Sequence, residues 1–311
     1  MQEYTIIVDD EYDGIRLDKA LTGLIEPVLS RSYIIKLIED GNVSVDNKIR
    51  KKSYTLTEGN TITLTLPDAT EYKIEPENIP LDILYEDDDV IVVNKPSGMV
   101  VHPAAGHLSG TLVNALMYHC GDSLSGINGI LRPGIVHRID KDTSGSIIAC
   151  KNDASHASIA GQLKDHSLDR TYRALCIGEP KEDEFTVNAP IGRDPKDRKK
   201  MAVVSGGKEA VTNVTVLARL VGASYIECRL KTGRTHQIRV HMESIGHPLI
   251  GDEVYNKGPK ATGIWTKLNS DGQALHAYKL GFTHPTTNKR ILTVAPIPEY
   301  MASVVEKFGQ F

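Results

Sequence analysis

Apolar residues recur along the chain with two different periods, and these periods predict a mixture of helices and strands. Apolar side chains at 17, 20, 21 and 24 have helical spacing, and a second helical pattern runs through residues 34–38. Short apolar runs between turn residues predict strands over 61–66, 90–93, 146–150, 171–177, 224–230 and 275–282. Further helices are expected after Thr111, over 154–165, after Thr235 and over 301–311.

A polar, acidic stretch separates two parts of the chain. Residues 67–80 begin and end with proline and carry Glu71, Glu75 and Glu77, which is typical of an interdomain linker. We therefore expect a small domain over residues 12–68, a linker over 69–80 and a larger domain over 81–300.

Composition and charge limit the possible classes of protein. The 311 residues are 40% hydrophobic and 24% charged, as in a globular protein with a sizeable core. The net charge of −4 means that local basic patches would have to hold any nucleic acid. The four cysteines include no CxxC pair and indicate reduced thiols in a cytoplasmic protein. Residues 1–7 lack a signal-peptide pattern, and no apolar run has the length of a membrane helix.

A polar loop over residues 132–145 lies between two apolar runs. Pro133-Gly134 marks its start and Ser144-Gly145 its end. His137, Arg138 and Asp140 are thus on a loop held between structured segments, where functional residues are often found. By itself, Asp140 is either a catalytic carboxylate or a cap of a turn.

The sequence His137-Arg138-Ile139-Asp140, followed by Thr143-Ser144-Gly145, resembles the His-Arg-Leu-Asp-x-x-Thr-Ser-Gly signature of the RluA/RluD family of RNA pseudouridine synthases. Further similar segments are residues 94–103, 110–116, 172–174, 198–203, 232–239 and 247–255. The resemblance implies an α+β fold, with a large mixed, mostly antiparallel sheet and flanking helices. It also implies the isomerisation of RNA uridine to pseudouridine without a cofactor.

The resemblance assigns roles to individual residues. Asp140 is expected to be the catalytic carboxylate, Tyr172 to stack on the target base and Arg234 to pair with the carboxylate. Arg138 is expected to fill the space left by a flipped base, with His137 beside it in substrate binding. Attack at C1′, addition to C6 and glycal formation all remain open as the route.

The N-terminal segments, with Arg-Leu-Asp at 16–18 and Gly-x-Val-x-Val-Asp-Asn-Lys at 41–48, resemble the S4 RNA-binding domain. Arg16 and Arg31 are candidate phosphate contacts there. The basic run over 191–203 predicts an exposed hairpin or loop, with Lys199 and Lys200 as further contacts. The segment that contains Lys95 makes this residue either a phosphate contact or a structural cation. We expect a monomer that acts on RNA, foremost 23S-type ribosomal RNA or its precursor.

Three other interpretations compete with this one. The chain could bind RNA without catalysis. It could be a glycoside hydrolase that uses Asp140 and Asp142, although residues two apart on a short loop rarely face each other across a sugar. The histidines at 236, 241 and 247 suggest zinc, but no HExxH or CxxC accompanies them, and no metal is expected.

Overall fold

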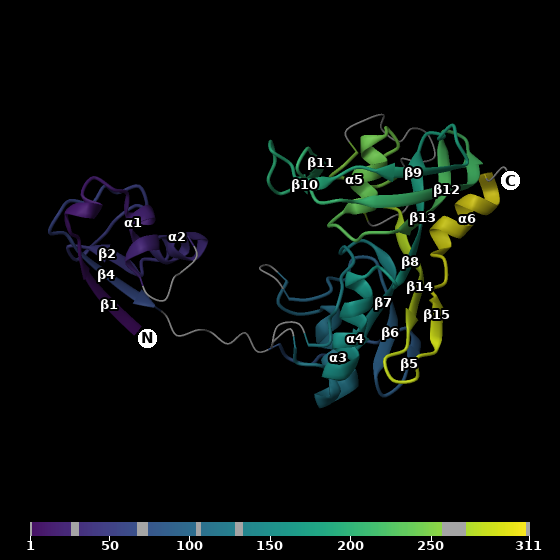
Figure 1. The fold of residues 1–311 in the computed structure, drawn as a ribbon, viewed down its shortest axis with the longest axis horizontal. Coiled ribbons are helices and arrows are strands. Elements are labelled where there is room, and N and C mark those ends of the chain that lie inside the picture. The colour runs from purple at the N-terminus through teal and green to yellow at the C-terminus, as the bar shows by residue number, and fades with distance from the viewer. Residues whose placement is uncertain are drawn as a thin grey trace. The chain divides into compact units, whose positions relative to one another are not determined.

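A computed structural model describes residues 2–25, 31–66, 74–103, 107–127, 133–256 and 272–308. The chain forms two compact units, Met1–Tyr72 and Lys73–Phe311 (Figure 1). Both combine helices with sheets in which nearly all neighbouring strands are antiparallel. The α+β fold expected from the sequence is therefore confirmed.

The N-terminal unit has a small antiparallel sheet and two helices. Its elements are β1 (Gln2–Ile7), the 3-10 turn η1 (Asp10–Tyr12), α1 (Leu17–Leu24), α2 (Arg31–Glu39), β2 (Val43–Val45), β3 (Lys48–Ile49) and β4 (Thr61–Leu66). The apolar faces of the helices pack with the sheet, as the buried side chains of Leu17, Ile34 and Ile62 show. Because β1 pairs with β4 along its whole length, this unit begins at residue 2 and not at residue 12 as expected.

In its described residues, the C-terminal unit contains a nine-stranded sheet, a hairpin and four α-helices. The strands are β5 (Ile83–Glu86), β6 (Val90–Lys95), β7 (Ser144–Cys150), β8 (Asp169–Ile177), β9 (Glu184–Asn188), β12 (Val211–Leu220), β13 (Ala223–Leu230), β14 (Leu275–Thr283) and β15 (Arg290–Val294). The hairpin joins β10 (Ile191–Arg193) to β11 (Met201–Val203). The helices are α3 (Leu112–Cys120), α4 (Asp153–Lys164), α5 (Gln237–Ser244) and α6 (Glu299–Phe308), with the 3-10 turn η2 (Gly121–Ser123) after α3.

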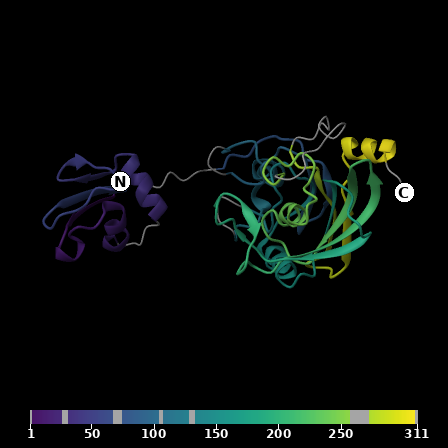
Figure 2. The same cartoon turned by 90° about the horizontal axis from the view of Figure 1, so that it is seen from above.

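Alternation along β8 divides the core between the two faces of the sheet. Tyr172, Ala174 and Cys176 pack in the same cluster as the apolar side chains of α3 and α5. Leu175 and Ile177 belong to the apolar cluster that includes Met301 of α6. Helix α6, the yellow helix next to the C-terminus in Figure 2, packs against β12. The predicted strand over 171–177 is confirmed, and its alternation directs Tyr172 toward the face that carries α5.

The segment after residue 73 belongs to the C-terminal unit. Ile74 is buried in the main core, and Glu77 accepts a hydrogen bond from the amide of Gly110. The Asn114 side chain donates to the carbonyl of Glu75. The linker expected over 69–80 therefore ends before residue 74, and its earlier part lies outside the described residues. The unit also extends past residue 300, because Met301 of α6 is fully buried.

At the centre of the large sheet, β7 pairs with β14 in parallel. Strand β7 directly follows the loop over 133–143. Gly145 lies at this junction with φ +108°, and a Cβ there would collide with the backbone of Ala277. Only glycine allows the two strands to approach so closely. The strand that leaves the loop is thus fixed against β14.

We predict that Gly145→Ala destabilises the protein by at least about 2 kcal/mol, because the backbone of β14 must move away. The matched control is Gly161→Ala in α4, where a Cβ meets no atom within 4 Å. That substitution should stabilise by roughly 0.5–1 kcal/mol through helix propensity. Urea unfolding would measure both changes, and equal stability of the two variants would contradict the close-approach argument.

Candidate active site

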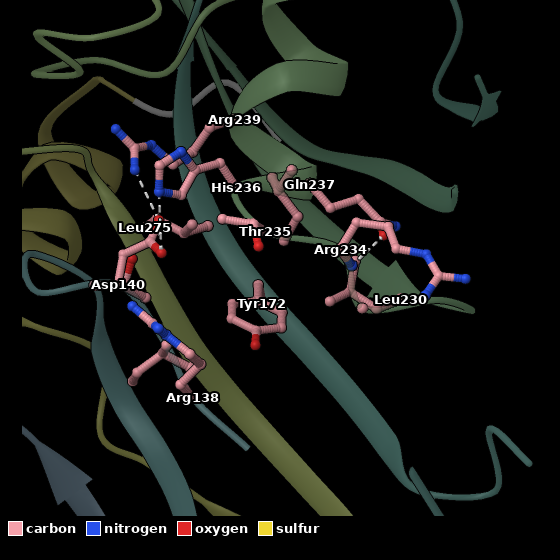
Figure 3. Close-up of a pocket in the computed structure, with 14 residues that line it drawn as sticks. Arg138, Asp140, Tyr172, Leu230, Arg234, Thr235, His236, Gln237, Arg239 and Leu275 are labelled. Atoms are coloured by element: carbon pink, nitrogen blue, oxygen red, sulfur yellow. Dashed lines mark hydrogen bonds and ion pairs between the residues drawn. The ribbon is translucent and has the colours of Figure 1, made fainter. Parts of the chain in front are cut away.

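A cavity of about 260 Å³ lies in the C-terminal unit, where three segments meet (Figure 3). The loop before β7 contributes Arg138 and Asp140, and β8 contributes Tyr172. The turn between β13 and α5, with the first turn of α5, contributes residues 233–239. The structure therefore brings together Asp140, Tyr172, Arg138 and Arg234, which the sequence analysis selected from distant parts of the chain.

Arg239 holds the Asp140 carboxylate. Its Nη1 donates to Asp140 Oδ2 at 2.7 Å, while Nε and Nη2 donate to the two oxygens of Asp252 at 2.7 and 3.0 Å. Burial alone would lower the pKa of Arg239, but Asp252 and Asp140 raise it above its usual value. The guanidinium therefore stays charged, and its planar fork fixes the direction of the carboxylate.

The prediction that Arg234 pairs with Asp140 was wrong. Arg234 donates from Nε to the carbonyl of Glu209 at 2.8 Å, and its side chain points away from Asp140 (Figure 3). The Gln237 side chain accepts a hydrogen bond from the Arg234 amide and so fixes the turn before α5. Arg239 lies inside the helix, three residues before the buried Met242 and on the same inward face. That spacing was the available signal for Arg239, and the sequence analysis missed it.

His236 gives Asp140 a second neighbour. Its Nε2 lies 3.6 Å from Asp140 Oδ1, which is too long for a hydrogen bond. Its Nδ1 is 2.7 Å from the Tyr255 hydroxyl, which accepts a hydrogen bond from the Met201 amide. Tyr255 therefore fixes the ring through Nδ1, and Nε2 faces Asp140.

His236 also replaces Thr235 at the start of α5. The helix begins after His236, whose backbone is left-handed with φ 56°, and no side chain caps it. The expected cap at Thr235 was therefore wrong. Burial lowers the pKa of His236, although Asp140 acts in the opposite direction. A left-handed backbone at a non-glycine residue is costly and is often found at functional sites.

Lys95 fixes the loop over residues 133–143 from one side. The residue is fully buried, and its Nζ donates to the carbonyls of Pro96, Met99 and Lys141, each at 2.8 Å. Burial lowers the pKa of Lys95 to about 7, with Asp142 and Asp140 opposing the shift. Lys95 thus has a structural role, and its alternative assignment as a phosphate contact was wrong because the amine is enclosed by backbone oxygens.

Strand β14 and Gln273, two residues before it, fix the same loop from the other side. Gln273 donates to the Thr143 hydroxyl at 3.0 Å. The Ser144 hydroxyl lies 2.8 Å from His276 Nδ1. The end of this loop is therefore connected to its neighbours by side-chain hydrogen bonds as well as by the sheet, which favours a preorganised carboxylate.

Tyr172 presents a largely buried ring to the cavity, with 8% of its surface exposed. Burial raises the pKa of its phenol, and Arg170 opposes this effect. The phenol therefore keeps its proton at neutral pH. With Ile139, Leu230 and Leu275, the ring gives the cavity an apolar surface on which a base could stack.

His137 faces the protein rather than a ligand. Its Nε2 accepts a hydrogen bond from the Ile148 amide at 3.1 Å. Burial, with a contribution from Arg170, lowers the pKa of His137 to about 3, so the ring is neutral. His137 thus serves in the structure as an anchor of the loop, whereas we expected it to contact RNA.

The remaining expected RNA contacts lie outside the cavity. Arg16 forms an ion pair with Asp18 at 2.9 Å, and the side chain of Arg31 lies outside the described part of the structure. The predicted basic hairpin is confirmed as β10–β11. Lys199 is exposed in it, while Lys200 donates to the carbonyl of Val254 at 3.0 Å. Contact of these residues with RNA stays a prediction.

Comparison with known proteins decides the family. Residues 89–244 match the family model described as RNA pseudouridylate synthase, and residues 15–62 match that of the S4 domain. The chain is 49% identical over 306 residues to a Bacillus subtilis protein named uncharacterized RNA pseudouridine synthase YlyB, with 98% of each protein covered. This chain belongs to the RNA pseudouridine synthase family.

Other relatives of the pseudouridine synthase agree with this. A Zymomonas mobilis protein named ribosomal large subunit pseudouridine synthase D is 48% identical, with 95% of this chain and 94% of that protein covered. The solved structure titled human RNA pseudouridylate synthase domain containing 1 is similar at a TM-score of 0.58 and 25% identity, over 75% of this chain and 89% of that one. The chain is therefore an isomerase that converts RNA uridine to pseudouridine, and the family excludes glycoside hydrolysis as its reaction class.

Within the described ranges, no cluster of three or more His, Cys, Asp or Glu side chains is arranged to hold a metal ion. Among the same residues, no helix combines the length and the apolar character needed to cross a membrane.

We predict that Arg239→Gln lowers kcat by at least about 100-fold, because Asp140 loses its orientation. Arg234→Gln is the control, since it removes a guanidinium from the same cavity without freeing Asp140. It should leave kcat near the wild-type value. Single-turnover rates would test both variants, and a larger loss from Arg234→Gln would contradict the assignment.

Lys95→Met should destabilise the protein by about 2–4 kcal/mol, because three buried carbonyl oxygens lose their donor. The side chains have similar length, so packing changes little. Chemical unfolding would measure the effect, and the variant should retain binding of RNA at temperatures where it is folded. Wild-type stability of Lys95→Met would contradict the structural role.

Proposed function

We propose that this enzyme isomerises specific uridines of large-subunit ribosomal RNA, in the 23S-type RNA or its precursor. The observation that carries the chemistry is the Asp140 carboxylate, held by Arg239 beside the ring of Tyr172 in one cavity. The choice of RNA is supported by the printed name of the Zymomonas mobilis relative. The S4 domain supports structured RNA as the partner.

The reaction requires a free carboxylate oxygen next to the nucleoside. The N1–C1′ bond breaks, the uracil turns, and C5 bonds to C1′; C5 loses a proton and N1 gains one. Arg239 occupies Asp140 Oδ2, whereas the nearest charged neighbour of Oδ1 is at 3.6 Å. Oδ1 therefore keeps lone pairs for the substrate. Attack at C1′, addition at C6 and assistance in glycal formation are all compatible with this position.

A uridine must leave its helix to reach Asp140, at a cost of a few kcal/mol. In the proposed complex, stacking of the base on Tyr172 offsets part of this cost. Arg138 is exposed at the cavity and is the side chain that would fill the vacated space. Its guanidinium would also stack on the neighbouring bases.

The N-terminal unit would add sequence-independent affinity. Arg16 lines a hollow of about 480 Å³ with Arg50, Lys51 and Lys52, a basic surface suited to phosphates. The enzyme is proposed to act as a cytoplasmic monomer, and its four free cysteines fit a reducing compartment.

The proposal predicts release of tritium from large-subunit ribosomal RNA labelled at C5 of uridine. Wild type should release it, and Asp140→Asn should bind the RNA without release. Asp142→Asn is the matched control and should retain release, because the loop uses the backbone oxygen of Asp142 as the acceptor for Ser97. No release from ribosomal RNA by wild type would contradict the proposed substrate, and equal release by Asp140→Asn would remove Asp140 from the centre of the reaction.

A further inference from the structure

Arg170 lies beside the cavity without a role in the site described above. It precedes Tyr172 by two residues on β8, so both side chains leave the same face of the strand. Its guanidinium lies across the backbone of Gly233, an exposed residue that lines the cavity. A Cβ on Gly233 would meet three atoms first, and all three belong to the Arg170 guanidinium.

Within the part of the chain that the structure describes, the Arg170 guanidinium has no counter-charge. Among the described residues, none forms a hydrogen bond or ion pair with it, and its buried Nε is unpartnered. Arg173, on the opposite face of the same strand, also has a buried Nε without a partner, but its Nη2 is paired with Glu227 at 2.8 Å. Buried polar atoms are nearly always hydrogen-bonded, so an orphaned Nε requires an explanation.

The charge of Arg170 also acts on its neighbours. It contributes to lowering the pKa of His137 and opposes the rise in the pKa of Tyr172. An uncompensated cation next to the cavity is unfavourable unless a ligand brings the opposite charge. The substrate of this family is a polyanion, and an arginine fork matches the geometry of a phosphate.

We propose that Arg170 binds a backbone phosphate of the RNA strand next to the target uridine. Two residues along a strand are about 7 Å apart. A base on Tyr172 and a phosphate on Arg170 would then belong to the same or adjacent nucleotides. Gly233 is required because its bare backbone leaves room for the guanidinium. The inference rests on the proposed action on RNA and adds a substrate contact to that site.

The first test is the salt dependence of RNA binding by Arg170→Gln. Affinity for a large-subunit ribosomal RNA transcript should fall, and the slope of log K against log salt should decrease by about 0.7–0.9, the value for one lost phosphate contact. Arg170→Lys should keep the slope. The control Arg219→Gln removes a partly exposed arginine that is paired with Asp183, and should match wild type. An unchanged slope in Arg170→Gln would overturn the proposal.

The second test moves the Arg170 charge without removing it. Gly233 has no left-handed φ, so in Gly233→Ala the added Cβ conflicts only with the guanidinium. This variant should weaken RNA binding, and Arg170→Gln/Gly233→Ala should bind no more weakly than Arg170→Gln alone. Additive losses in the double variant would contradict a shared site. Thermal unfolding of each variant would confirm that it is folded.

The proposed substrate and the proposed Arg170 contact can be contradicted by different results. If wild type releases tritium from ribosomal RNA while Arg170→Gln keeps the wild-type slope, only the Arg170 contact is wrong. If wild type neither binds nor modifies ribosomal RNA, the proposed substrate is wrong, and the Arg170 contact to that RNA is wrong with it.

Discussion

The site depends on one guanidinium that binds two carboxylates from different parts of the chain. Arg239 joins α5 to Asp140 in the loop before β7 and to Asp252 after the helix. Burying these charges is costly and becomes favourable only when each is paired and hydrogen-bonded. Asp252 meets that condition because it also accepts from the amides of Val254 and Tyr255. Tyr255 in turn contacts His236, so the same arrangement sets both neighbours of Asp140.

The scaffold around Arg239 and Asp140 explains why a loop can hold the carboxylate in a fixed position. Lys95 gathers three carbonyl groups beneath it, and Gly145 lets β7 pass directly beside β14. A carboxylate in such a frame needs little reorganisation when the substrate arrives, which is a major source of catalytic rate. In the proposed complex, the apolar ring of Tyr172 and the flanking arginines serve different parts of a nucleotide, its base and its charged backbone.

Much of this was available from the sequence, and the failures have physical reasons. Strands β7 and β8 were predicted because buried strands are short apolar runs between turn residues. Strand β12 was missed because Thr212 occupies a buried position, where His241 and Gln237 satisfy its hydroxyl. The sequence left the role of Lys95 open between a phosphate contact and a structural cation, because one of its carbonyl partners is residue 141, which only the fold brings near. The choice between Arg234 and Arg239 likewise depended on tertiary contacts with Asp140 and Asp252.

The most direct test of the account is chemical rescue of Arg239→Ala by guanidinium ion. Arg239 lines the cavity, so a small cation can enter the space left by its side chain. Single-turnover isomerisation would be measured with added guanidinium, well below denaturing concentrations, and with sodium at equal ionic strength. The account predicts recovery of the rate with guanidinium alone, and no recovery in Asp140→Ala. Wild-type turnover by Arg239→Ala without any added cation would contradict it.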